Sequence, residues 1–123
     1  MKKRILVVDD SASVRQQVGA VLASAGYDVV EAADGVLGGE AIARMPDLAL
    51  VICDVNMPNM NGIDMVAAAK SDGKNAALPI VMLTTEGQPG LVEQAKKAGA
   101  KGWIVKPFKN EMLIAAVRKL VGS

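Results

Sequence analysis

The most informative stretch of the chain is Leu48-Ala49-Leu50-Val51-Ile52-Cys53-Asp54, an uninterrupted apolar run that ends at an acid. A strand with one face in water alternates apolar and polar residues, and this run does not. The pattern is typical of a strand covered on both faces, as in a parallel sheet packed between helices. The run is also far shorter than the roughly 18 residues that a membrane-spanning helix needs.

Similar short runs, rich in valine and isoleucine, recur along the chain and predict four more strands. They lie at Ile5–Val8, Tyr27–Ala32, Pro79–Leu83 and Gly102–Val105. Apolar residues at helical spacing separate these runs and follow the last one. The predicted helices carry a stripe from Val14 to Ala25 and then span Val36–Met45, Ile63–Ser71, Gly90–Ala98 and Glu111–Val121. This alternation predicts an α/β fold, a doubly wound (βα)5 unit with a five-stranded parallel sheet and helices on both faces.

Local signals predict how some of these helices begin and how firmly they form. Ser11 or Ser13 can cap the first helix, and Asn110 can cap the last. The second helix is expected to be the least stable, because Gly38 and Gly39 each cost about 1 kcal/mol of helix stability relative to alanine.

The helical spacing also predicts which residues face the core. The expected stripes include Leu37, Ala41, Ile42 and Met45 in the second helix and Ile63, Val66, Ala67 and Lys70 in the third.

The composition restricts the classes of function. The 123 residues are 51% hydrophobic and 22% charged, which fits one domain, 1–123, with a core of its own. A formal net charge of +1 argues against a nucleic-acid binder, which usually carries a basic excess. The single cysteine, Cys53, is expected to be a buried, inert thiol. Because it cannot form an internal disulfide and no run suits a signal peptide, we expect a cytoplasmic protein that binds no membrane.

The chain contains no histidine. This excludes Ser-His and Cys-His catalytic pairs, zinc bound by histidine and a phosphohistidine carrier. Any chemistry must therefore come from carboxylates, lysines, hydroxyls, backbone amides and a bound ion.

Polar residues follow the predicted strands at the ends where open parallel sheets bind their ligands. They are Asp9 and Asp10 after the first strand, Asp54 after the third, Thr84 after the fourth and Lys106 after the fifth. Each by itself is most often a helix cap, a turn residue or a solvated charge. If the first and third strands are neighbours, the three carboxylates crowd together and favour a hard divalent cation such as Mg²⁺. With a lysine and a hydroxyl beside them, they make a cradle for a phosphoryl group, in which a carboxylate can act as nucleophile.

Four short motifs in this order resemble the receiver domain of two-component response regulators, in particular the single-domain, CheY-like chemotaxis type. The resemblance covers the whole chain and implies a flavodoxin-like sheet with strand order 2-1-3-4-5. The motifs are Val7-Val8-Asp9-Asp10-Ser11, Asp54-Val55-Asn56-Met57-Pro58 running on to Asn61-Gly62, Thr84 after Met82-Leu83, and Lys106-Pro107-Phe108.

Carried over position by position, the resemblance assigns the acids to a phosphorylation site. Asp54 would accept the phosphoryl group, Asp10 would bind Mg²⁺ directly, and Asp9 would support the ion mainly through water. Asn56 would offer its backbone carbonyl to the metal. The expected cofactor is therefore Mg²⁺.

The resemblance also implies a switch. Thr84 and Lys106 would bind the phosphoryl oxygens, and the Lys106–Pro107 peptide bond would be cis. Trp103 occupies the position of the switch aromatic, where tyrosine or phenylalanine is more usual, and is also a candidate for the partner surface.

Two polar residues are expected to control the lifetime of the phosphoryl group. Asn56 lies two residues after the acceptor and Glu86 two residues after the threonine. Residues of this kind leave room for an attacking water, so the sequence predicts a labile phosphoryl group, lasting seconds to minutes.

The resemblance implies a monomeric, stand-alone regulator and not an enzyme acting on other substrates. Its expected partners are a sensor histidine kinase, of chemotaxis type, and the flagellar motor switch or another output protein, with a phosphatase as a further candidate. A phosphate sink and a regulator of another pathway stay open as alternatives. A small Mg²⁺-dependent aspartyl phosphatase, a flavin binder and a receiver-shaped module that is never phosphorylated are weaker alternatives.

Overall fold

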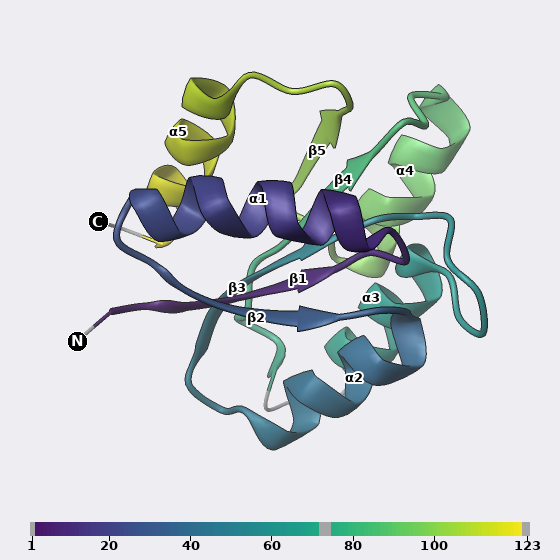
Figure 1. Ribbon diagram of the computed structural model, residues 1–123. Coiled ribbons are helices and arrows are strands. Elements are labelled where there is room, and N and C mark those ends of the chain that lie inside the picture. Colours follow the sequence, from purple (N-terminus) through teal and green to yellow (C-terminus); the bar gives the residue numbers. More distant parts are fainter. Residues whose placement is uncertain (1, 72–74, 122–123) are drawn as a thin grey trace.

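A computed structural model of the protein describes residues 2–71 and 75–121. Strands and helices alternate along the chain, as the sequence predicts (Figure 1). The elements are β1 (Arg4–Val8), α1 (Ala12–Ser24), β2 (Asp28–Ala32), α2 (Gly35–Arg44), β3 (Leu48–Cys53), α3 (Gly62–Ser71), β4 (Ile80–Thr84), α4 (Pro89–Ala98), β5 (Gly102–Val105) and α5 (Asn110–Val121).

The five strands form one parallel sheet in the order β2-β1-β3-β4-β5, which confirms the predicted fold and strand order. Helices α1 and α5 cover one face, and α2, α3 and α4 cover the other (Figure 1). Successive strand residues point to opposite faces. Leu6 and Val8 of β1 therefore pack toward α2–α4, while Ile5 and Val7 pack toward α1 and α5.

The central strand β3 explains why its sequence is apolar throughout. Val51 and Cys53 belong to the core on the α2–α4 side, and Leu50 and Ile52 belong to the core on the α1–α5 side. Both faces of β3 are thus buried, so no position of the strand needs a polar side chain to contact solvent.

Two helices differ from their predicted faces, although their positions along the chain are right. In α2, Leu37 is 46% exposed and Gly38 is buried in its place. A Cβ on Gly38 would lie 2.7 Å from Met65 Sδ, so the glycine permits the close contact of α2 with α3. In α3, Ala67 is exposed, while Met65 and Ala69 face the core. The buried face of α3 is shifted by one residue from the predicted stripe. In α2 the predicted Ala41 and Ile42 are buried, and only Leu37 is wrong.

Helix starts are a second point of comparison. Ser11 caps α1 by accepting a hydrogen bond from the Val14 N–H at 3.3 Å, as predicted. Asn110, the predicted cap of the last helix, is instead the first helical residue of α5. The end of a helix shifts by a residue easily, because its first N–H groups have no partner within the helix.

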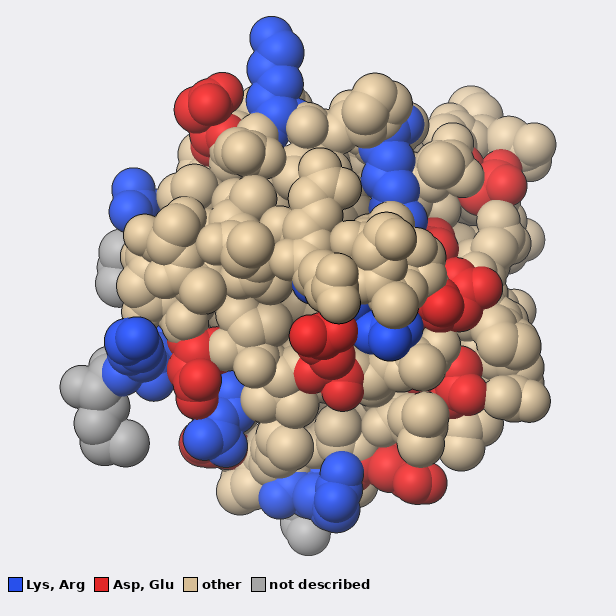
Figure 2. Space-filling model, in the orientation of Figure 1, with Lys and Arg blue, Asp and Glu red and all other residues tan. Residues whose placement is uncertain are grey.

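The surface carries both signs of charge. On the face formed by α1 and β2, acidic and basic side chains are interspersed, and no broad patch of one sign is visible (Figure 2). Within residues 2–71 and 75–121, no helix is long and apolar enough to span a membrane.

Candidate functional site

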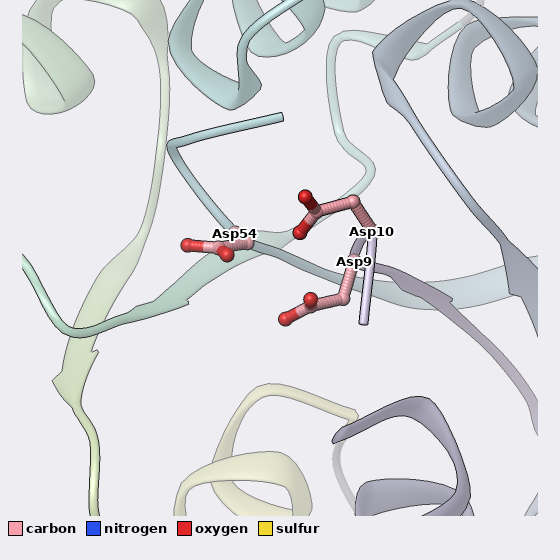
Figure 3. Close-up of side chains that lie close together, drawn as sticks. All are labelled: Asp9, Asp10 and Asp54. Atoms are coloured by element: carbon pink, nitrogen blue, oxygen red, sulfur yellow. The ribbon is translucent and has the colours of Figure 1, made fainter. Parts of the chain in front are cut away.

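Three carboxylates meet beyond the carboxyl ends of two adjacent strands. Asp9 and Asp10 follow β1, and Asp54 follows β3, which pairs with β1. One carboxylate oxygen from each lies within 4.8 Å of the others. Figure 3 shows the three side chains extending into the same space from the two strands. The predicted convergence of the acids is therefore present.

Asp9 is buried and held from several sides. The Ser11 N–H donates to its Oδ1 at 2.9 Å, and Lys106 Nζ donates to its Oδ2 at 2.9 Å. Its own N–H donates to the Ala32 carbonyl oxygen at 3.1 Å. These contacts fix the deepest acid of the cluster, whereas Asp10 beside it is exposed.

Lys106 brings the opposite charge into the cluster from the end of β5. Its Nζ lies 2.9 Å from Asp9 Oδ2 and 3.6 Å from Asp54 Oδ2. The Lys106–Pro107 peptide bond is cis, as expected from the resemblance. A single ammonium thus spans two of the three carboxylates and offsets part of their mutual repulsion.

Asp54 is held where the chain turns from β3 into the following loop. It is 9% exposed, and its Oδ1 accepts a hydrogen bond from the Val55 N–H at 2.7 Å. Gly62 packs directly under it: the Gly62 N–H donates to the Val55 carbonyl at 2.8 Å, and a Cβ on Gly62 would lie 1.9 Å from the Asp54 carbonyl oxygen. The absence of a side chain at Gly62 therefore sets how the loop passes Asp54.

Glu86 connects the remaining predicted site residues. The hydroxyl of Thr84, which is fully buried, accepts the Glu86 N–H at 3.3 Å. The Glu86 carboxylate accepts a hydrogen bond from Asn56 Nδ2 at 3.0 Å. Its carbonyl accepts one from Trp103 Nε1 at 2.8 Å. Sequence reasoning named all four residues and paired Asn56 with Glu86 beside the attacking water, but the hydrogen bonds that join them through Glu86 come from the tertiary structure.

The structure also adds residues that the sequence analysis did not single out. Arg15 of α1 donates from Nη1 to the Asp9 carbonyl at 2.6 Å and from Nε to Glu31 at 2.9 Å.

Asn59, in the loop after β3, adopts a left-handed conformation, φ 69°, and donates to Asp34 at 2.7 Å. An asparagine near a Met-Pro turn is the one local hint, since asparagine tolerates this conformation better than other non-glycine residues.

Two pKa shifts describe the surroundings of the site. Burial raises the pKa of the Cys53 thiol well above its usual range, and the charges of Asp54 and Asp9 raise it further. The structure confirms that the thiol is buried, and the raised pKa favours its protonated form. The Leu37 N–H and the Asn59 amide, which both donate to Asp34, lower the pKa of that carboxyl.

The donor set of the cluster fits a hard divalent cation. It offers carboxylate oxygens from two strands, close enough for one ion to contact all three acids. Within the described ranges 2–71 and 75–121, this is also the one group of three or more acidic, cysteine or histidine residues close enough to hold a metal ion.

Comparison with known proteins agrees with this geometry. The family model of the response regulator receiver domain matches residues 5–118. Chemotaxis protein CheY1 of Helicobacter pylori is 40% identical over 121 residues, covering 98% of each chain. The structure of chemotaxis response regulator CheY4 of Vibrio cholerae has a TM-score of 0.89 and 41% identity, over 98% of this chain and 99% of that one.

A third similar structure was solved with a metal ion. The receiver domain of sensor histidine kinase PA1611 from Pseudomonas aeruginosa has a TM-score of 0.91 and 26% identity, covers all of both chains, and has a magnesium ion coordinated in its active site cleft. The sequence match, the strand order and the clustered acids lead to one conclusion: the chain belongs to the response regulator receiver domain family.

Proposed function

We propose that the protein is a CheY-type response regulator that accepts a phosphoryl group on Asp54 from a phosphohistidine of a sensor kinase. The observation that carries the proposal is the cluster of Asp9, Asp10 and Asp54 with the Lys106 ammonium 3.6 Å from Asp54 Oδ2. It combines a nucleophile with the opposite charges that a transferring phosphoryl group needs.

In the proposed reaction, a carboxylate oxygen of Asp54 attacks the phosphorus of the donor. A P–O bond forms to Asp54 as the P–N bond to the donor histidine breaks, which leaves an acyl phosphate on Asp54. Lys106 is close enough to pair with the new phosphoryl oxygens, and Thr84 is the last residue of β4, at the same edge of the sheet. Positioning and charge neutralisation are the main contributions that such a transfer asks of a protein.

Mg²⁺ is the proposed cofactor. Asp10 and Asp54 would hold it directly, Asp9 mainly through water, and Asn56 through its backbone carbonyl. When bound, the ion supplies positive charge that offsets the charge on the carboxylates and on the phosphoryl oxygens. The exposed position of Asp10 leaves one side of the cluster open for such an ion and for the donor.

We further propose that phosphorylation shifts the protein toward a conformation that binds an output partner. A phosphoryl group favours that conformation only by as much as it binds it better. The Thr84–Glu86–Trp103 hydrogen bonds link the acceptor end of the sheet to the side chain proposed as the switch. Trp103 also packs against the core near α4, so a change at Thr84 can reach the surface formed by α4, β5 and α5.

The proposed partner is the flagellar motor switch, with a chemotaxis kinase as the phosphodonor. The support is the similarity to chemotaxis proteins over 98% of their length. The proposed receiver acts as a monomer in the cytoplasm. A phosphate sink or a regulator of another pathway would use the same site. Binding of beryllofluoride-activated protein to purified motor-switch protein distinguishes these alternatives, because a sink would not bind.

The acceptor is tested with Mg²⁺ and acetyl phosphate, followed by mass spectrometry of the intact protein. We expect one added phosphoryl group in the unmodified protein and none in Asp54→Asn. Asp47→Asn is the control, because Asp47 pairs with Arg4 at the other end of the sheet. The same modification in Asp54→Asn would overturn the assignment. Sustained release of phosphate from a phosphomonoester would instead favour a phosphatase.

A further inference from the structure

Arg15 connects the acidic site to the edge of the sheet. It lies in the first half of α1, and its side chain is 18% exposed. Its Nη1 donates to the carbonyl oxygen of Asp9 at 2.6 Å, while its Nε donates to Glu31 Oε1 at 2.9 Å. One guanidinium thus bridges the turn after β1 and the end of β2. The planar fork of arginine suits such a double contact, and its charge strengthens both hydrogen bonds.

The carbonyl that Arg15 holds belongs to the peptide between Asp9 and Asp10. A peptide unit is planar, so fixing its oxygen fixes the orientation of the whole unit up to the Asp10 Cα. The Asp9 N–H is held by Ala32, and the Asp9 carboxylate is held by Lys106 and by the N–H of Ser11, the residue after Asp10. Among these contacts, the Arg15 hydrogen bond is the one that acts directly on the peptide unit joining Asp9 to Asp10.

Asp10 depends on its backbone for its position. It is exposed, and among the hydrogen bonds between described residues none holds its carboxylate. Its side chain nevertheless extends into the same space as Asp9 and Asp54 (Figure 3). The orientation of the Asp10 backbone therefore decides whether the Asp10 carboxylate faces the cluster.

We infer that Arg15 is a positioning residue of the acidic site: by holding the Asp9 carbonyl, it directs the Asp10 carboxylate toward a bound cation. The inference rests on the proposed binding of Mg²⁺ at Asp10. Groups that orient metal ligands typically change metal affinity by about 10- to 100-fold when removed, and we expect the lower end because Arg15 acts through the backbone.

A purely electrostatic role for Arg15 predicts the opposite sign. Its positive charge contacts the Asp9 carbonyl and would oppose a cation at the acids, so removal of the charge alone should tighten Mg²⁺ binding. Arg15→Lys separates the two roles, because lysine keeps the charge but lacks the planar fork that contacts Glu31 and the Asp9 carbonyl together. Arg15→Gln removes both.

The test is a calorimetric Mg²⁺ titration of the unmodified protein, Arg15→Lys, Arg15→Gln and Glu31→Gln. We expect the Kd for Mg²⁺ to rise by about tenfold in Arg15→Lys, and to rise also in Arg15→Gln. A smaller rise is expected in Glu31→Gln, which loosens the guanidinium from β2. Arg4→Lys is the matched control. Arg4 bridges Asp28 and Asp47 at the start of β1, so this variant should bind Mg²⁺ as the unmodified protein does.

A second readout separates positioning from damage to the fold. With acetyl phosphate as donor, the Mg²⁺ concentration giving half the maximal phosphorylation rate should rise in Arg15→Lys, while the rate at saturating Mg²⁺ stays unchanged. An unchanged Kd in Arg15→Lys, or a fall in the saturating rate with no change in Kd, would overturn the inference and leave the proposed function intact. A lack of Mg²⁺ binding by the unmodified protein would instead overturn the proposed function, and the inference with it.

Discussion

The Asn56 side chain donates a hydrogen bond to the Glu86 carboxylate across 3.0 Å and so joins the loop after β3 to the loop after β4. The two residues are 30 positions apart in the sequence. They are also the two that the sequence predicts to flank the path of a water attacking the phosphoryl group. The bridge places a carboxylate and an amide together, and in the proposed phosphorylated state both are available to hydrogen-bond such a water.

Replacement of Glu86 should lengthen the life of the phosphoryl group. In Glu86→Leu, an apolar side chain replaces the polar end of the bridge and disfavours water beside Asp54. We expect dephosphorylation to slow by about tenfold, equivalent to about 1.4 kcal/mol in the barrier. Loss of the acyl phosphate over time, followed after removal of the donor, measures the rate. Glu86→Gln keeps a hydrogen-bonding partner for Asn56 and should change the rate less. A half-life in Glu86→Leu that is unchanged or shorter contradicts the prediction.

Removal of Lys106 should destabilise the protein in a manner that Mg²⁺ reverses. Lys106→Met leaves the buried Asp9 without its ammonium partner, and breaking a buried ion pair costs about 3 kcal/mol or somewhat more. Urea denaturation with and without Mg²⁺ measures the effect on the free energy of unfolding. The cation should restore part of the loss, because it supplies the missing positive charge. Lys109→Met, at an exposed position, should be neutral. Equal losses with and without Mg²⁺ would argue against a cation site at these acids.

Trp103 should contribute to stability through its N–H group as well as its ring. Trp103→Phe keeps an aromatic ring in contact with the core but removes the hydrogen bond to the Glu86 carbonyl. We expect the free energy of unfolding to fall by about 1 kcal/mol from the lost hydrogen bond, with a further loss from the smaller ring. Because the hydrogen bond ends on Glu86, the variant should also alter binding of the activated protein to its partner. Unchanged stability together with unchanged partner binding would show that the indole N–H has no such role.

Asp34 should make stability depend on pH in the acid range. Its carboxylate accepts hydrogen bonds from the Leu37 N–H and the Asn59 amide, which lower its pKa below the ordinary value of 3.8. The stabilisation that the Asp34 carboxylate contributes to the folded state is therefore complete above the pKa of Asp34 in the unfolded chain. It is lost as the pH falls through the lower pKa of Asp34 in the folded protein. The stability difference between the unmodified protein and Asp34→Asn should be constant from neutral pH down to about pH 5 and shrink below 3.8.

Urea denaturation at a series of pH values tests this, with Asp64→Asn as the comparison. Asp64 also lies near a helix start but is exposed, and it receives its side-chain hydrogen bond from Asn61. If the Asp34→Asn difference stays constant down to pH 2, the Asp34 carboxylate does not contribute in the way that its hydrogen bonds indicate.

Much of the fold was predictable because it depends on local patterns. The apolar run at Leu48–Cys53 indicated a strand covered on both faces, and β3 has those bounds. The alternation of runs and stripes predicted five strands and five helices in the observed order. Which residues of a helix are buried was harder to predict. Gly38 is buried in α2 because it lets Val8 and Met65 approach, and no hydrophobicity pattern marks a glycine as a core residue.

The sequence by itself determined which chemical groups stand at the ends of the strands, since β1, β3 and β5 lead directly into an acid or a lysine and β4 ends on a threonine. Only the tertiary structure decided how these groups meet. Pairing of β1 with β3 brings Asp9, Asp10 and Asp54 together, and the loops bring Asn56 to Glu86 and Arg15 to the Asp9 carbonyl. Contacts between residues far apart in the sequence depend on how helices and strands pack, and the order of residues along a chain carries little record of that packing.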